Sequence, residues 1–186
     1  MTQPFFTIGH STRSIEAFAG LLVPNDVKLL VDVRKVPRSR FNPQYNADAM
    51  PAALAPYGIA YEHMGALGGL RGRVREISPD TNAYWENANF HNYADYAMTP
   101  AFRAAFEELV KRGDERRCAI MCAESVWWRC HRRIITDYLL AAGHDVFHLI
   151  ESDVPEPARI TPEATAVAAG LAYPSVQGHL SLGSGS

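Results

Sequence analysis

Short runs of apolar residues alternate along the chain with longer segments in which apolar residues recur every three or four positions. Continuous apolar runs are typical of buried strands, and five strands are predicted, over residues 5–9, 27–34, 59–64, 117–122 and 145–150. The periodic segments predict amphipathic helices, over residues 15–22, 47–57, 99–112, 129–142 and 163–169. The aromatic-rich segment 82–98 is expected to be partly helical.

Capping residues set the expected helix bounds. Ser14 precedes the first periodic segment and is a suitable N-cap. Thr99 is followed by Pro100, a combination typical of a helix start. Gly113 and Gly143 follow the last periodic positions of two helices and are expected to end them.

Predicted strands and helices follow one another in a repeated strand–helix order, which is typical of an α/β domain with a parallel sheet. The chain has 186 residues, 47% of them hydrophobic, which is enough for one core. We therefore predict a single three-layer α/β domain over residues 1–175, with a mainly parallel sheet of about five strands. Residues 176–186 are expected to be a disordered tail or a cloning remnant.

Charge, basic residues and cysteine count bear on which ligands and which cellular location are expected for this protein. The net charge of −2 gives no whole-chain argument for binding nucleic acid, yet 15 of the 18 basic residues are Arg. Arg suits bidentate recognition of carboxylate or phosphate, although a GC-rich genome would give the same bias. No signal peptide and no membrane-length apolar segment is seen in the sequence. Three cysteines make no disulfide framework, so a cytoplasmic location is expected.

Polar or reactive residues follow the end of nearly every predicted strand. In open parallel sheets ligands bind at the carboxyl ends of the strands, so these residues are expected to share one rim. They are His10, Ser11, Asp32, Arg34, Arg38, Arg40, His63, Gly68, Gly69, Cys122, Glu124 and His148.

All three cysteines lie in the stretch CAIMCAESVWWRCHRR, residues 118–133. Cys122 ends a strand and faces the start of the next helix, where the helix dipole and nearby Arg residues favour the nucleophilic thiolate. A buried structural cysteine is the alternative at this position. Cys118 lies inside the strand and is expected to be structural.

Cys130, His131 and Glu124 extend this cluster. Cys130 is a candidate to resolve or pair with an oxidised Cys122, or simply to pack beside Ile134. His131 is either an acid–base group or a surface residue, and Glu124 is a possible general acid or base that would oppose an anion unless an Arg neutralises it.

A metal site is another alternative, with Cys122, Cys130 and His131 as ligands and His10 as a candidate fourth ligand. The spacing C-x7-C-H is not a standard zinc pattern. The strand–Cys–loop–helix layout is distantly similar to rhodanese and phosphatase loops, but its Arg spacing differs from both. The cofactor is left open.

Arg-rich loops at 33–40 and 70–76, together with Trp and Tyr residues, suit a nucleotide or single-stranded nucleic acid. The alternative is a solvated Arg face over an ordinary aromatic core.

Several motifs together resemble the DUF488 family, a bacterial and archaeal group of undefined function: TIGHS, DVRKVPRSR, LGG, Tyr-Ala-Asp-Tyr, CAE and CHR. The resemblance covers roughly residues 5–174, although the segment LIESDVPEPA departs from it. It implies a single α/β domain but no particular reaction. The matching positions are His10, Ser11, Asp32, Arg34, Arg38, Arg40, Gly68, Gly69, Tyr96, Cys122, Glu124, Cys130, His131 and Arg132.

Three functions follow from these patterns, and whether the protein is an enzyme is left open. The first is an enzyme with a cysteine-centred, Arg-lined site for an anionic small molecule. Its catalytic residues would be Cys122, Glu124, His10 and His131, and the other matching positions, Tyr96 and Cys130 included, would bind substrate. The second is a nucleotide- or nucleic-acid-binding module, and the third is a metal-binding protein.

Overall fold

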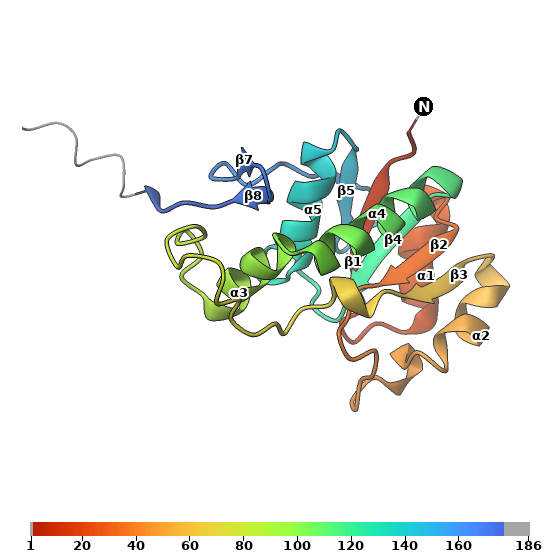
Figure 1. Ribbon diagram of the computed structural model, residues 1–186. Helices are drawn as coiled ribbons and strands as arrows, with labels where there is room; N and C mark the ends of the chain where they lie inside the picture. Colours follow the sequence, from red (N-terminus) through yellow and green to blue (C-terminus); the bar gives the residue numbers. More distant parts are fainter. Residues whose placement is uncertain (1, 177–186) are drawn as a thin grey trace, which may run out of the picture.

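The computed structural model describes residues 2–176 and has a six-stranded sheet at its centre (Figure 1). The strand order is β3-β2-β4-β1-β5-β6, and every pairing is parallel except β5 with β6. The strands are β1 (Phe5–Gly9), β2 (Leu29–Asp32), β3 (Ala60–His63), β4 (Cys118–Cys122), β5 (Val146–Leu149) and β6 (Glu156–Pro157). The predicted α/β class and mainly parallel sheet are confirmed, with one short antiparallel strand added at the edge.

Helices cover both faces of this sheet, which confirms the three-layer prediction (Figure 1). One face packs against α1 (Ile15–Leu22) and α2 (Met50–Leu54). The other packs against α3 (Ala88–Ala97), α4 (Pro100–Glu115) and α5 (Arg132–Ala141). Within the described residues, no helix combines the length and the apolar character needed to cross a membrane.

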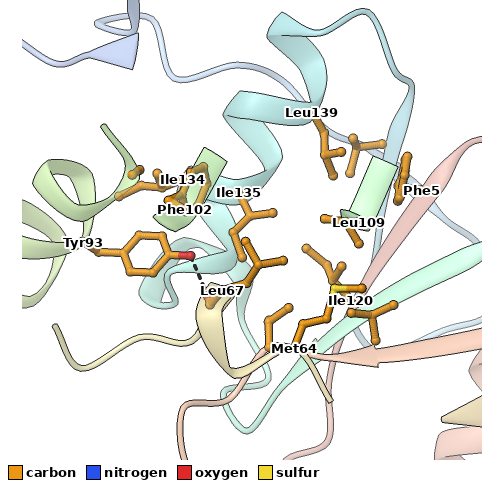
Figure 2. Close-up of a cluster of buried hydrophobic side chains, with 14 of the residues drawn as sticks. Phe5, Met64, Leu67, Tyr93, Phe102, Leu109, Ile120, Ile134, Ile135 and Leu139 are labelled. Atoms are coloured by element: carbon orange, nitrogen blue, oxygen red, sulfur yellow. Dashed lines mark hydrogen bonds between the residues drawn. The ribbon is translucent and has the colours of Figure 1, made fainter. Parts of the chain in front are cut away.

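Alternate residues of the central strand β4 enter two separate cores, since successive side chains of a strand point to opposite faces. Ile120 belongs to the core under α3, α4 and α5, and Met121 to the core under α1 and α2. Figure 2 shows the first core, in which Ile135 of α5 and Leu109 of α4 approach Ile120. Cys122 is two residues after Ile120, so it lies on the α5 side of the sheet.

Both predicted N-caps are present. The Ser14 hydroxyl accepts a hydrogen bond from the Ala17 N–H at 3.1 Å, and the Thr99 hydroxyl accepts one from the Phe102 N–H at 3.5 Å. The predicted stop at Gly113 is wrong, because α4 continues to Glu115 and Gly113 lies in its buried face. The position needs glycine because the Phe5 ring occupies the space where a Cβ would stand.

The predicted helix over 163–169 is also wrong. This segment forms a two-stranded antiparallel hairpin of β7 (Thr165–Val167) and β8 (Gly170–Ala172). Gly170 has a φ of 141°, which a helix does not allow, and the Leu171 N–H donates to the Tyr138 hydroxyl of α5 at 3.0 Å. Tertiary contact with α5 therefore overrides the weak helical pattern.

Two further bounds differ from prediction. α5 begins at Arg132 instead of 129, because residues Trp127–Arg129 form a separate 3₁₀ turn and Cys130 is extended. α2 is shorter than predicted, and a 3₁₀ turn replaces its last part at Ala55–Tyr57, where Pro56 supplies no N–H. The helical part of 82–98 is α3. Of the predicted tail at 176–186, residues 177–186 lie outside the described residues.

Two glycine-to-alanine substitutions are expected to have opposite effects on stability. Gly113→Ala places a methyl group in the Phe5 ring and should destabilise the fold by about 1–3 kcal/mol. Gly20→Ala in α1 meets no atom within 4 Å, so better helix propensity should stabilise the fold by up to about 1 kcal/mol. Urea denaturation measures both, and equal effects would contradict the packing of Gly113 on Phe5.

Candidate functional site

The carboxyl ends of β1, β2 and β4 meet at one rim because β4 pairs in parallel with both of the other strands. Gly9 lies opposite Cys122, and Asp32 opposite Met121. Beyond the strands the pairing continues through backbone bonds from His10 N–H to the Cys122 carbonyl, 2.9 Å, and from Val33 N–H to the Met121 carbonyl, 2.9 Å. The rim expected from the sequence therefore exists at these three strands.

A cavity of about 330 Å³ opens at this rim. Tyr93, Cys122 and Cys130 are its most buried lining residues, with 1%, 3% and 6% of their surfaces exposed. Basic side chains line it from the loops after β2 and β4, and aromatic side chains line it from α3. The residues that line it are Arg34, Lys35, Val36, Arg38, Gly69, Leu70, Asn89, Phe90, Tyr93, Cys122, Ala123, Glu124, Arg129, Cys130 and His131.

The two cavity cysteines are in direct contact. Their Sγ atoms are 2.7 Å apart, and both are free thiols. The Cys130 Sγ is 3.5 Å from Nδ1 of His131 and accepts a hydrogen bond from the Arg132 N–H of the α5 N-terminus at 3.5 Å. The Cys122 Sγ is also 3.6 Å from the Glu124 carbonyl.

These contacts separate the pKa values of the two thiols. Burial raises the pKa of Cys122 well above its ordinary value, and the hydrogen bond shared with Cys130 raises it further. Burial also opposes ionisation of Cys130, but the hydrogen bond from Cys122 and the charges of His131 and Arg132 outweigh it and lower the pKa of Cys130. The groups that stabilise a thiolate therefore gather at Cys130, whereas the sequence pattern pointed to Cys122.

Packing fixes the orientation of His131. Its Nε2–H donates to the Val33 carbonyl at 2.7 Å, which directs Nδ1 toward Cys130. The Tyr93 ring packs edge-on against the imidazole with centroids 5.0 Å apart, and the Tyr93 hydroxyl donates to the Leu67 carbonyl (Figure 2). A Cβ on Gly69 would stand 3.0 Å from Nδ1 of His131, so glycine allows the imidazole to lie close to this loop.

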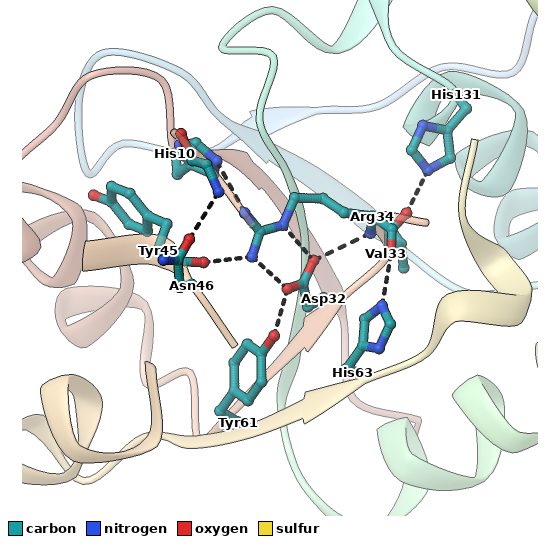
Figure 3. Close-up of polar contacts among 10 residues, drawn as sticks. His10, Asp32, Val33, Arg34, Tyr45, Asn46, Tyr61, His63 and His131 are labelled. Atoms are coloured by element: carbon teal, nitrogen blue, oxygen red, sulfur yellow. Dashed lines mark hydrogen bonds and ion pairs between the residues drawn. The ribbon is translucent and has the colours of Figure 1, made fainter. Parts of the chain in front are cut away.

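Asp32 and Arg34 form a buried ion pair beside the cavity (Figure 3). Arg34 Nε donates to Asp32 Oδ1 at 2.9 Å and Nη2 donates to Oδ2 at 2.7 Å. Tyr61 also donates to Oδ2, at 2.5 Å, and Arg34 reaches the Tyr45 carbonyl at 2.6 Å. Asp32 therefore holds Arg34 in place and does not itself line the cavity.

His10 belongs to the same network. Its Nδ1–H donates to the Ser11 carbonyl at 2.8 Å, and Nε2 accepts from Arg34 Nη1 at 3.4 Å. The imidazole stacks on Tyr45, with centroids 4.3 Å apart, and burial lowers its pKa. His10 is therefore neutral, has both ring nitrogens engaged, and does not line the cavity.

Arg132 lies behind the two sulfurs and is 0% exposed. Its Nη2 donates to the Glu124 carbonyl at 2.5 Å and its Nη1 donates to the Thr7 hydroxyl at 3.3 Å. Thr7 also bonds Nδ1 of His148 at 2.7 Å, and His148 stacks on Trp127 with centroids 4.4 Å apart. Burial and the Arg132 charge lower the pKa of His148 to about 3, so its imidazole is neutral.

Other predicted site residues lie away from the cavity lining. Arg40 is exposed, with its guanidinium 6.0 Å from the Phe41 ring centroid. Tyr96 donates to the Ala66 carbonyl at 2.5 Å and lies under Arg71. Gly68 packs against the backbone of Lys35, and Ser11 occupies a turn with a φ of 48°.

Sequence reasoning missed Lys35, Asn89, Phe90 and Tyr93 as lining residues. Phe90 and Tyr93 are three positions apart in the aromatic segment, a spacing that puts them on one face of α3 and that could have marked them. Their approach to Cys130 depends on how α3 packs beside α5, which no local pattern encodes.

The metal alternative stays a prediction, and the arrangement of the side chains does not favour it. Among residues 2–176, no group of three or more His, Cys, Asp and Glu side chains is arranged to hold a metal ion. The two sulfurs are 2.7 Å apart, whereas two thiolates on one tetrahedral zinc, each at about 2.3 Å, would be about 3.7 Å apart.

Fold and site together define a single α/β domain with a thiol-containing cavity at the carboxyl edge of its parallel sheet. The sequence matches the family described as "Domain of unknown function DUF488" over residues 14–139, and the chain belongs to this DUF488 family. The matched range contains Cys122, Cys130 and His131. No curated protein and no solved structure matches the chain. The layout shared with rhodanese and phosphatase loops stays a prediction.

Loss of the Asp32 charge should destabilise the fold much more than loss of the Tyr61 hydroxyl. Asp32→Asn leaves the buried Arg34 guanidinium without a carboxylate and is expected to cost about 3 kcal/mol. Tyr61→Phe removes one hydrogen bond to the same carboxylate and should cost about 1 kcal/mol. Urea denaturation compares the two, and equal losses would contradict a framework role for the Asp32–Arg34 pair.

Proposed function

We propose that this protein is a cysteine-dependent enzyme whose substrate is an anionic small molecule bound in the cavity. The observation that carries the proposal is the environment of Cys130. Its sulfur contacts a second thiol, an imidazole nitrogen and a helix N-terminal N–H, and it borders an open cavity. Reactive cysteines are typical of such electropositive, partly accessible surroundings.

Each residue near the two thiols has a separate role in a reaction of a thiolate. Cys130 is the nucleophile, and Cys122 donates a hydrogen bond to it and is placed to react with it next. His131 carries Nδ1 toward Cys130, as required of a group that accepts the thiol proton and later returns it. Glu124 lines the mouth of the cavity as a second candidate for proton transfer. His10 is a less direct candidate for proton transfer than His131 or Glu124, because it contacts Arg34 instead of the thiols.

Charge in the cavity favours an anion. Lys35, Arg38 and Arg129 line it beside the Asp32-paired Arg34, and Glu124 is the one carboxylate among the described lining residues. The volume of about 330 Å³ is at the small end of the range for ligand sites. Phe90 and Tyr93 add an aromatic wall, which suits a substrate that joins a charged group to an apolar body.

Cys130 should be the most reactive of the three thiols. At pH 7 iodoacetamide should label it at least about tenfold faster than Cys118, whose pKa burial raises to about 12. Because the pKa of Cys130 is lowered, its labelling rate should level off at a lower pH than the rate of an ordinary thiol. Peptide mass mapping over time measures this. Slow and equal labelling of all three thiols would contradict the proposal.

Inorganic phosphate should protect Cys130 from labelling if the cavity binds anions. Arg38→Ala and Arg129→Ala each remove a lining charge, so each should raise the half-protecting phosphate concentration about threefold, as exposed charges contribute up to about 1 kcal/mol. Arg40→Ala is the matched control, since Arg40 lies outside the lining, and it should leave protection unchanged.

A binding module is the second candidate. Phe41 is 87% exposed and Trp128 is 45% exposed, and Arg40 lies over the Phe41 ring. Exposed aromatics beside Arg suit stacking on single-stranded nucleic acid. Salt-dependent binding of an oligonucleotide that is weakened by Arg40→Ala, with no phosphate protection of Cys130, would favour this function over the enzyme.

A further inference from the structure

Arg132 is a buried cation without a carboxylate partner. Its side chain is 0% exposed, Nε has no hydrogen-bond partner, and the other nitrogens reach only a carbonyl and a hydroxyl. Within residues 2–176, the ion pairs of the structure do not include Arg132. A buried charge is costly unless an opposite charge compensates it.

The two cysteines are the groups that can supply this charge. Burial opposes ionisation of Arg132, yet its interactions with Cys122 and Cys130 more than offset this and raise its pKa. The neighbouring His148 is neutral, and the Glu124 side chain is exposed. One thiolate shared by the pair, with the charge on Cys130 and the proton on Cys122, therefore compensates Arg132.

Oxidation would remove this compensating charge. The sulfurs are 2.7 Å apart, so only a small movement brings them to the roughly 2.05 Å of a disulfide. A disulfide carries no charge, and Arg132 would then be a buried cation with neutral neighbours only. A couple whose reduced form is stabilised in this way is an oxidant.

We propose that Cys122 and Cys130 form a strongly oxidising dithiol–disulfide couple, in which the buried Arg132 guanidinium stabilises the reduced form. This inference rests on the proposed function, because it assigns a reaction class to the same thiolate. The co-reactant is a low-molecular-weight disulfide, RSSR, with anionic groups that suit Lys35, Arg38 and Arg129.

The exchange proceeds in two displacements. The Cys130 thiolate attacks one sulfur of RSSR, the S–S bond breaks, and RS⁻ leaves. The Cys122 sulfur then gives its proton to that RS⁻ and attacks the Cys130 sulfur, releasing a second RS⁻. The cysteine pair loses two electrons and becomes a disulfide, and RSSR gains two electrons and becomes RSH and RS⁻. The reverse sequence oxidises two thiols of a substrate.

Glutathione disulfide is the probe for the test. The full chain is treated at pH 7 with a large excess of glutathione disulfide, because a couple that favours its reduced form is oxidised only against such an excess. Peptide mapping should then find a Cys122–Cys130 disulfide with Cys118 still reduced. In urea denaturation the reduced chain should unfold at a higher midpoint than the oxidised chain. The control is Cys118→Ala, which removes the thiol outside the cavity and should preserve the difference between reduced and oxidised chains.

The opposite order of midpoints would overturn the inference, since closing a short loop ordinarily stabilises a fold. Arg132→Met removes the charge that is proposed to stabilise the reduced form. It should therefore shift the equilibrium with glutathione toward the protein disulfide by about tenfold or more. An unchanged equilibrium would also overturn the inference. If Cys130 labels rapidly with phosphate protection but no disulfide forms, this inference fails while the proposed enzyme stands. Slow labelling of Cys130 overturns both.

Discussion

Parallel pairing of β4 with β1 on one side and β2 on the other is the constraint on which the site depends. It places the chain segments after Gly9, Asp32 and Cys122 at one edge of the sheet, although they lie far apart in sequence. The same pairing extends into the loops, where His10 and Val33 bond the backbone of β4 and its end. Because the loops start from one rigid edge, their side chains form a cavity with defined geometry.

Two buried guanidinium groups at this edge are compensated in different ways. Arg34 is neutralised by the Asp32 carboxylate and serves as framework for the loop after β2. Arg132 has no carboxylate among the described residues and interacts instead with the two sulfurs. A carboxylate keeps its negative charge at neutral pH, whereas a thiolate loses its charge when it is alkylated, oxidised or protonated. In the function proposed above, the first guanidinium stabilises the fold and the second is coupled to the chemistry of the thiols.

Expectations based on apolar runs were sound because burial on both faces requires apolar residues at every position of a central strand. β4, with all five residues buried, is the clearest case. Expectations about helix ends were less sound. Gly113 continues α4 because the Phe5 ring needs its space, and the segment after Thr161 forms a hairpin because Tyr138 and α5 hold it. In both cases a partner remote in sequence outweighs a weak local preference.

The sequence by itself determined the α/β class, the strands and the presence of reactive residues at their carboxyl ends, because burial patterns and strand–helix order are local properties. Only the tertiary structure decided which thiol has the groups that favour a thiolate around it, that His10 is engaged by Arg34, and that Lys35, Phe90 and Tyr93 line the same cavity as the cysteines. A pKa depends on burial and on charges within a few ångströms. At Cys130 those neighbours come from β4, α5 and the loop after β2, which meet only when the sheet has formed.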